Sequence, residues 1–553
     1  MLVLLLIAAA GVYFVALGNS AIWDANEAFY VETPREMIEA RDFINPTFNY
    51  LPRFNKPVLS YWIVAGLYEA FGVSVSVQRF GIALGALLII ACAFILARCG
   101  MPDSGSGIPD ARSGIQDQRS GIRDSAAFWA AAGLAAAPRL VMFARRIFID
   151  IWITAFMALT LACFALSERY PERRRLFLIL MYVSIGLGAL TKGPVAIALP
   201  ALAFGLYLVV IRDLKKVLHI MLPLGIVIVA AIVVPWYYAL YREHGWTYIS
   251  SFLINENVER FTQGVGVRQP RPIWFYLPVV VSDSFPWSVL LFAAAAAWKQ
   301  RTRIETLLWC WIAAIVVFFS FSAGKQDLYI FPIVPAVAAL GGIAIQRGLS
   351  QPQWRDWVTR TLAVTGFLLA MAGGAVVWLF DTAGRVYALD GALIVGAIAL
   401  GGGVVTLLLG LSNRTPAAAM TLLAAIVAVN WTAVVRVLPE FERYKPVPGF
   451  SETLRQRLQP GDVVAHYQVA LPSMVFYLQR HVDQFFDEAP FIESMRSGKR
   501  VYAVLSADDY ASLSTQLPRT CVLDHRPTFE VKLRQVLKRQ PLPELLLISN
   551  HCP

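Results

Sequence analysis

The chain contains a long series of apolar segments, each about as long as a helix that crosses a membrane. A transmembrane helix needs roughly 17–25 apolar residues at a rise of about 1.5 Å per residue. The segments of this 553-residue chain that meet or approach that length lie near 1–18, 78–98, 126–143, 147–166, 176–191, 193–211, 219–240, 273–297, 305–322, 328–346, 361–380, 391–411 and 416–437. The sequence therefore predicts a polytopic α-helical membrane protein with about 13 transmembrane helices.

The composition supports this fold class. Hydrophobic residues make up 57% of the chain and charged residues 15%, whereas a soluble globular protein has about 45–50% and about 25%. A soluble enzyme, a disordered protein and a disulfide scaffold are therefore excluded. The net charge is +11, and residues 438–553 carry 14 basic and 13 acidic side chains. The positive charge is thus spread over the membrane part, which argues against nucleic-acid binding.

The positions of the basic loops predict the orientation in the membrane. Short loops rich in Lys and Arg occur near 173–175, 212–216, 299–303 and 347–360. With thirteen spans these loops all lie on the side of the N-terminus, which is then cytoplasmic. The first span lacks a basic leading region and an A-x-A site, so we expect an anchor and not a signal peptide.

Three segments then face the outside or periplasm. Two are loops, 19–77 and 241–272, inserted in a transmembrane domain of residues 1–437. In the first loop we expect a helix from Glu27 to Ala40 and an interfacial helix over 57–71. The third segment, 438–553, alternates β-rich and helical runs, which predicts a soluble α/β domain.

Other segments give weaker signals. The cytoplasmic loop 99–125 has a degenerate repeat rich in Gly, Ser and charge, so we expect a mobile linker. Cys521 and Cys552 both lie in the exported tail, where a disulfide is possible. The spacing of Cys and His residues does not match a metal site, and we predict neither a metal nor another cofactor.

Two carboxylates follow the first span directly. Asp24 and Glu27 lie in the run Trp-Asp-Ala-Asn-Glu that starts at Trp23. A carboxylate this close to hydrocarbon either pairs with a cation or has a raised pKa. The pair is a candidate reacting centre, and the alternative is an interfacial charge that anchors the span beside Trp23.

Basic residues in the tight turns on the predicted outer side form a second signal. They are Lys56, Arg145, Arg146, Lys192 and Lys325. Basic residues outside run against the positive-inside bias, and the planar fork of Arg matches two phosphate oxygens. We therefore predict a phosphate-binding face, although a single lysine here is equally explained by a side chain that reaches the interface.

The second external loop contains further polar residues. Asn257 and Arg260 lie in an N-V-E-R-F run, and Arg271 precedes an aromatic run that re-enters the membrane. Glycines at 264 and 266 allow this loop to move. Folding over a bound substrate and simple connection of two spans remain alternatives. His244 is a lone external histidine and is read as a surface residue.

With these residues in view, the chain resembles the lipid-linked-sugar glycosyltransferases of the protein O-mannosyltransferase and aminoarabinose (lipid A) transferase superfamily. The motifs occur in family order between Trp23 and Pro335. They are W-D-x-x-E (Trp23, Asp24, Glu27), P-R-E-M (Pro34 to Met37), F-N-K-P…Y-W (Phe54 to Pro57, Tyr61, Trp62), R-R-x-x-x-D (Arg145, Arg146, Asp150), T-K-G-P (Thr191 to Pro194), N-V-E-R-F (Asn257 to Phe261), P-W (Pro286, Trp287) and K-x-x-x-Y-x-x-P (Lys325, Tyr329, Pro332).

The resemblance implies a GT-C fold and assigns roles to residues. Asp24 would be the catalytic carboxylate, with Glu27 beside it, and Asp150 would occupy a second acidic position. The polyprenyl phosphate would be held by Lys56, Arg145 or Arg146, Lys325 and Tyr329, and we add Lys192 because it belongs to the same set of external basic residues. The sequence departs from the aminoarabinose transferases at Asn55, where they usually carry Glu, and lacks their His near 268–270.

We therefore expect an inner-membrane glycosyltransferase that moves a sugar from a polyprenyl-phosphate donor by inverting displacement at the outer face. Basic residues would neutralise the leaving phosphate, and a carboxylate would act as general base. Lipid A, another glycan or a protein are the possible acceptors. Transfer most like that of aminoarabinose to lipid A is the first hypothesis, and mannosyl-type transfer to Ser or Thr is the second. A transporter of lipid-linked sugar and a non-catalytic sensor are alternatives of other classes.

Overall fold

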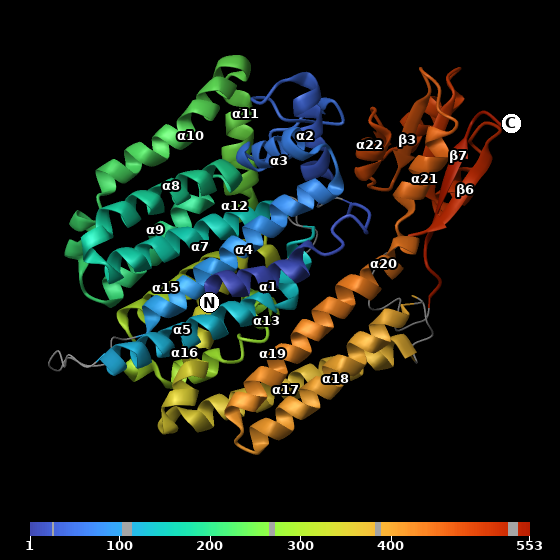
Figure 1. Ribbon diagram of the computed structural model, residues 1–553. Helices are drawn as coiled ribbons and strands as arrows, with labels where there is room; N and C mark the ends of the chain where they lie inside the picture. The colour runs from blue at the N-terminus through green and yellow to red at the C-terminus, as the bar shows by residue number, and fades with distance from the viewer. Residues whose placement is uncertain are drawn as a thin grey trace.

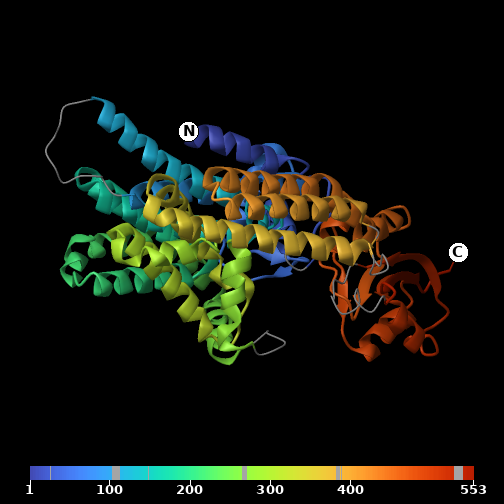
Figure 2. The same cartoon turned by 90° about the horizontal axis from the view of Figure 1, so that it is seen from below.

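The structure is a computed structural model that describes residues 1–24, 27–101, 113–146, 148–264, 271–381, 387, 389–528 and 540–552. A large helical bundle is followed by a small domain built on a β-sheet (Figure 1). Figure 2, turned by 90°, also places the sheet domain at one end of the bundle, beyond the ends of α17 (Pro352–Asp381), α18 (Asp390–Leu411) and α19 (Thr415–Thr432).

The bundle confirms the predicted polytopic helical membrane protein. Its remaining helices are α1 (Leu2–Phe14), α4 (Val75–Gly100), α5 (Ser113–Ala135), α6 (Pro138–Phe143), α7 (Phe148–Arg169), α8 (Arg174–Lys192), α9 (Val195–Val210), α10 (Leu222–His244), α13 (Tyr276–Asp283), α14 (Leu291–Ala296), α15 (Arg303–Ser320) and α16 (Val334–Ser350). Within the described ranges, nine helical segments are long and apolar enough to cross a membrane, and three more are apolar but shorter. Twelve of the thirteen predicted spans overlap one of these segments, and the exception is 126–143.

Two predicted spans are broken helices. The segment 126–143 is divided between α5 and α6, because Pro138 begins a new helix after Ala137 adopts an extended conformation. The segment 273–297 stops at Asp283 and resumes at Leu291. Pro286 lies in this interruption and lacks the N–H that a continuing helix needs. The prediction of a mobile linker over 99–125 is wrong from Ser113 onward, because those residues belong to the helix α5. Residues 102–112 lie outside the described ranges.

Both external loops have regular structure. The first contains α2 (Ala28–Ala40), a short hairpin of β1 (Thr47–Phe48) and β2 (Leu51–Pro52), and α3 (Leu59–Phe71). The expected helix over 27–40 is thus α2, and the expected helix over 57–71 is α3. The second loop contains α11 (Trp246–Ser250), a π-helix (Ser251–Glu259) and α12 (Arg260–Gln263).

The tail has the predicted α/β fold. Its five-stranded sheet has the order β4-β3-β5-β7-β6, with β3 parallel to β4 and β5, and β7 antiparallel to β5 and β6. The strands are β3 (Val463–Tyr467), β4 (Asp483–Phe485), β5 (Val501–Ser506), β6 (Cys521–Pro527) and β7 (Glu544–Ser549). The helices are α20 (Leu438–Phe441), α21 (Pro446–Arg455), α22 (Ser473–Leu478), α23 (Glu488–Arg496) and α24 (Ala507–Leu513).

The tail packs on the first external loop. Asn49 of the hairpin exchanges two hydrogen bonds with the backbone of Val482, each 2.8 Å long. Phe476 and Tyr477 of α22 cover a small apolar cluster that includes Ile22 and Val31. The possible disulfide between Cys521 and Cys552 is not formed, because both residues are free thiols.

Candidate active site

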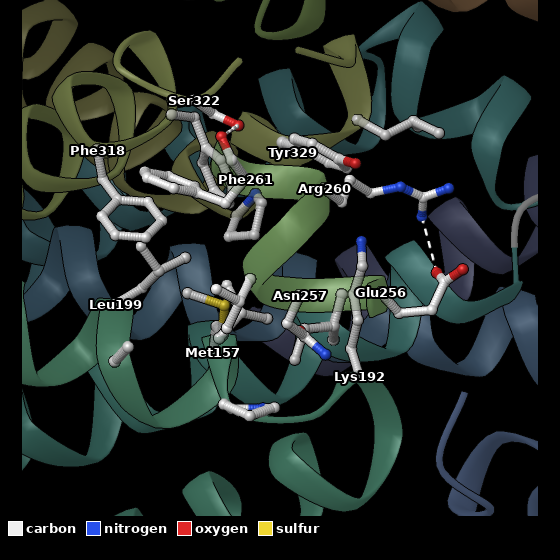
Figure 3. Close-up of a pocket in the computed structure, with 18 of the residues that line it drawn as sticks. Met157, Lys192, Leu199, Glu256, Asn257, Arg260, Phe261, Phe318, Ser322 and Tyr329 are labelled. Carbon is white, nitrogen blue, oxygen red and sulfur yellow. Dashed lines mark hydrogen bonds and ion pairs between the residues drawn. The ribbon is translucent and has the colours of Figure 1, made fainter. Parts of the chain in front are cut away.

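A cavity of about 380 Å³ opens among α7, α8, α9, α15 and the second external loop. Its wall has two chemically distinct parts. Charged and polar residues occupy one part, and they are Lys56, Lys192, Glu256, Asn257, Arg260 and Tyr329. Apolar residues occupy the other, and they include Met157, Leu199, Phe318 and Phe319. Figure 3 shows Lys192, Glu256 and Arg260 together, and Phe318 and Leu199 at the far side.

The charged part of the cavity wall consists of linked ion pairs. Glu256 accepts from Lys56 at 3.0 Å and from Arg260 at 2.9 Å, and Lys192 pairs with Asp150 at the first turn of α7. Burial lowers the pKa of Lys56, while the carboxylate of Glu256 opposes that shift. Three cations thus share two carboxylates within one partly buried cluster, which leaves an excess of positive charge.

Local backbone structure explains how these residues meet. The π-helix carries Glu256 and Asn257, and Arg260 follows at the start of α12. π-helical segments are rare and are found mostly at functional sites. Lys192 is the last residue of α8, and Gly193 then adopts a φ of +88°. A Cβ at Gly193 would lie 2.6 Å from the ring of Phe252, so glycine is required for the turn after Lys192.

Tyr329 joins the charged and apolar parts of the cavity. It lies in a short 3-10 helix (Asp327–Ile333) before α16. The Lys192 ammonium lies 5.6 Å from the centre of its ring, and the ring also packs on Phe319 at a centroid distance of 5.0 Å. The cavity can therefore receive an anionic group at one end and a hydrocarbon chain at the other.

Glu27 lies apart from the cavity, in a buried ion pair. Its carboxylate accepts from Arg79 Nε at 2.6 Å and from Arg79 Nη2 at 2.9 Å. The side chains of Glu27 and Arg79 are 0% and 1% exposed. Arg79 also donates to the carbonyl oxygens of Leu17, Ser20 and Ala21. This pair fixes the chain where it leaves α1.

The two predicted arginines have different surroundings. Arg145 is buried and donates to the carbonyl oxygens of Val15 and Ala16 at 2.7 and 2.9 Å, so it caps the end of α1. Burial lowers the pKa of Arg145 to about 10. The guanidinium of Arg146 instead lies 5.3 Å from the ring centre of Trp23, and its Nε has no hydrogen-bond partner among the described residues.

Asp24 lies between the bundle and the tail. Its Oδ1 accepts a hydrogen bond from the backbone N–H of Ser473, the first residue of α22, at 2.8 Å. Burial raises the pKa of Asp24 to about 6, and the hydrogen bonds from Ser473 and the charge of Lys445 oppose that shift. Such a carboxylate changes protonation state close to neutral pH, which suits a general base.

The helix after Asp24 lies against the start of α7. The ring of Tyr30 in α2 stacks on Tyr61 and on Phe148, at centroid distances of 5.7 and 6.1 Å. Phe148 precedes Asp150 by two residues, so α2 connects the Asp24 region with the helix end that carries the partner of Lys192. The two parts of the site therefore share one end of the bundle.

Two further predicted residues do not line the cavity. Lys325 is buried, and its ammonium donates to the carbonyl oxygen of Ser322 at 2.6 Å. Arg271 is exposed and lies over the ring of Phe275 at 4.4 Å. The structure thus brings Lys56, Lys192, Arg260, Asn257 and Tyr329 together at the cavity, with Asp150 behind Lys192, and places the other predicted residues outside it.

Sequence reasoning missed three residues of this region, Arg79, Glu256 and Ser473. Arg79 lies inside the predicted span 78–98, and an ionisable residue inside a span signals a buried partner. Glu256 lies four residues before Arg260, the spacing of an ion pair on a helix. Ser473 gave no signal, because its contribution is a backbone N–H. In the described part of the chain, no three His, Cys, Asp or Glu side chains are grouped to hold a metal ion.

Comparisons with known proteins agree with the resemblance seen in the motifs. Residues 117–249 match the family described as dolichyl-phosphate-mannose-protein mannosyltransferase. Proteins named undecaprenyl phosphate-alpha-4-amino-4-deoxy-L-arabinose arabinosyl transferase are also similar. One from Pseudomonas aeruginosa (strain UCBPP-PA14) is 29% identical over 62% of this chain and 59% of its own length. One from Pseudomonas savastanoi pv. phaseolicola is 30% identical over 64% of this chain and 62% of its own length. These matches span less than two thirds of the relatives.

Two solved structures have the same fold. The crystal structure of ArnT from Cupriavidus metallidurans bound to undecaprenyl phosphate superposes with a TM-score of 0.79 at 23% identity, covering 100% of this chain and 98% of that one. Its apo form gives a TM-score of 0.77 at 23% identity, over 99% and 97%. The comparisons confirm the resemblance to the lipid-linked-sugar glycosyltransferases, and the expected GT-C fold with a C-terminal α/β domain is confirmed.

Proposed function

We propose that this chain is a membrane glycosyltransferase that moves a sugar from a polyprenyl-phosphate donor to an acceptor at the outer face of the inner membrane. The observation that carries the proposal is the two-part cavity, which has cations at one end and hydrocarbon at the other. A polyprenyl phosphate has the same division. The N-terminus and the basic loops would be cytoplasmic, and the tail would be periplasmic.

The cations of the cavity would bind the phosphate of the donor. Lys56, Lys192 and Arg260 are held in place by Glu256 and Asp150. Phosphate oxygens arriving between them would replace part of these carboxylate contacts. Because charge-assisted hydrogen bonds are about twice as strong as neutral ones, the same cations would stabilise the negative charge on the departing phosphate. Arg146 is a further candidate, since its Nε finds no acceptor among the residues that the structure describes.

Asp24 would act on the acceptor, either as a general base or by orienting it. In an inverting displacement the acceptor oxygen forms the new bond to the anomeric carbon, and the bond from that carbon to the phosphate oxygen breaks. The phosphate leaves with the electron pair, and Asp24 takes the proton of an acceptor hydroxyl. If the acceptor is already an anionic phosphate, as on lipid A, Asp24 orients it and removes no proton. The buried pair of Glu27 and Arg79 would hold the loop that carries Asp24.

The decisive experiment compares wild type with Asp24→Asn in lipid nanodiscs. The purified proteins receive undecaprenyl-phosphate aminoarabinose and lipid A, and products are read by mass spectrometry. We expect transfer to fall in the variant while the donor lipid still binds, by about 10²–10⁴-fold if Asp24 takes the proton of an acceptor hydroxyl and by less if it orients an anionic phosphate of lipid A. Glu39→Gln is the matched control, because this carboxylate of the same loop is 55% exposed. Transfer unaffected by Asp24→Asn would contradict the role of Asp24, and donor uptake without transfer would support a transporter.

Mannosyl-type transfer to protein is the second candidate. The match of residues 117–249 to the mannosyltransferase family supports it. A parallel reaction with polyprenyl-phosphate mannose and a Ser/Thr-rich peptide separates the two. A mass increment on the peptide and none on lipid A would favour this candidate.

A further inference from the structure

A second cavity, of about 320 Å³, lies at the opposite end of the bundle. It is bounded by the ends of α4 and α7, the starts of α8 and α15, and a 3-10 segment (Leu214–His219). α4 starts near Arg79 and ends at this cavity, and α7 starts near Asp150 and ends here also. The whole length of both helices therefore separates this cavity from the candidate active site.

The second cavity is strongly basic. Four basic side chains line it, Arg169, Arg174, Lys216 and Arg303, together with one acid, Glu168. Glu168 accepts from Lys216 and lies 3.6 Å from Arg174, so it holds two of the four cations in place. The Nε of Arg174 is buried and has no hydrogen-bond partner among the described residues. An excess of three positive charges remains around a space large enough for a small anion.

A third, smaller cavity of about 150 Å³ adjoins the basic one and shares Cys99 and Arg169 with it. Its wall is mainly apolar, with Leu2, Phe94, Ile95 and Leu166 from α1, α4 and α7. Arg123 lies at the edge of this smaller cavity, and its pKa is lowered mainly by burial and also by repulsion from Arg169 and Arg98. The two cavities together therefore offer cations beside a hydrocarbon surface.

We propose that these two cavities bind an anionic phospholipid, with the phosphate in the basic cavity and the first part of an acyl chain in the apolar one. Basic pockets between transmembrane helices commonly bind anionic headgroups, and Arg offers two parallel N–H donors to phosphate. A free phosphate would use the basic cavity but gain nothing from Leu2, Phe94, Ile95 and Leu166, so the apolar wall favours a lipid. The site is independent of the proposed transferase reaction.

Native mass spectrometry of the delipidated full-length protein tests this proposal. The protein is titrated separately with phosphatidylglycerol, phosphatidylcholine and inorganic phosphate. We expect wild type to retain phosphatidylglycerol in preference to phosphatidylcholine and to bind inorganic phosphate more weakly. Arg174→Gln/Arg303→Gln is expected to weaken phosphatidylglycerol retention by about 30-fold. Arg173→Gln/Arg175→Gln, which removes the same charge from two exposed neighbours outside the cavity, should retain it.

Three outcomes would overturn the proposal. Equal loss in both double variants would mean that general surface charge binds the lipid. Inorganic phosphate bound as tightly as phosphatidylglycerol would make the site a free-anion site. Ile95→Trp changes no charge and fills the apolar cavity. If this variant retained phosphatidylglycerol as well as wild type does, the placement of the acyl chain would be contradicted. Thermal unfolding of each variant confirms that it is folded before its lipid binding is compared.

Discussion

Two groups of basic residues at the same end of the bundle differ in what their charges contact. Lys56, Lys192 and Arg260 line the first cavity, are 18–28% exposed and pair with side-chain carboxylates. Arg79 and Arg145 are 1% and 5% exposed and donate to backbone carbonyl oxygens at the end of α1, and Arg79 also pairs with the buried Glu27. A partly exposed cation whose partner is a side-chain carboxylate can exchange that partner for a ligand. A cation that satisfies helix carbonyls is part of the fold.

The largest effect should come from breaking the buried pair. Glu27→Gln leaves the guanidinium of Arg79 without its charged partner, and removing one member of a buried ion pair costs about 3–5 kcal/mol. We expect a matching loss in the free energy of unfolding, measured by denaturation in detergent micelles. Replacing both residues with leucine should not restore that loss, because the carbonyl oxygens of Leu17, Ser20 and Ala21 would then lose the donor that Arg79 provides. A stable Glu27→Gln protein without transferase activity would place Glu27 in the reaction instead.

Substitution of a cavity cation should weaken ligand binding and leave the stability of the protein almost unchanged. Lys192→Gln removes a charge-assisted contact of about 1.5–3 kcal/mol, so undecaprenyl phosphate should bind about 10–100-fold more weakly while the unfolding temperature changes little. Binding is measured by microscale thermophoresis. Arg271→Gln is the control, because Arg271 is an exposed cation outside the cavity. Equal loss in both variants would mean that binding responds to the net positive charge of the protein and not to the cations of the cavity.

A comparison of Arg146 with Arg145 tests whether Arg146 belongs with the cations that bind a ligand or with those that stabilise the fold. Its Nε has no protein partner in the described chain, so Arg146→Gln should lower the free energy of unfolding less than Arg145→Gln does. We expect donor binding to weaken by about tenfold, the effect of one lost charged hydrogen bond. Unfolding and donor binding measured on both variants make the comparison. A larger destabilisation by Arg146→Gln than by Arg145→Gln would assign Arg146 to the fold.

The smallest effect concerns pH. Burial raises the pKa of Asp24 to about 6, and a general base works only when it is deprotonated. Lowering the pH from 8 to 6 should therefore reduce kcat/KM to about half, with a further decline below pH 6. Transfer rates measured across this range test the prediction, with unfolding followed in parallel. A flat profile down to pH 5 would indicate that Asp24 orients an already anionic acceptor.

The sequence could predict the spans because hydropathy and length are local properties. The interruption after Asp283 has a local signal in Pro286, but the ion pair of Asp283 with Arg139 of another helix at 3.1 Å depends on tertiary packing and could not be predicted. The sequence predicted the residues of the candidate active site in the same partial way. The positions of Lys192 and Arg145 both follow from short turns on one side of the membrane, but their partners, Asp150 and the end of α1, depend on tertiary packing. Side-chain partners, and hence the division between binding and structural cations, are not encoded in the spacing of a turn.

The hydrogen bond from Ser473 to Asp24 joins positions 449 residues apart in the chain. The carboxylate is synthesised near the beginning, and its N–H donor follows after the last span. Asp24 therefore acquires its final environment only when every helix has been inserted and the tail has folded. This arrangement makes completion of that environment a late event in biogenesis, so a truncated or stalled chain would contain the bundle with Asp24 still lacking its N–H donor.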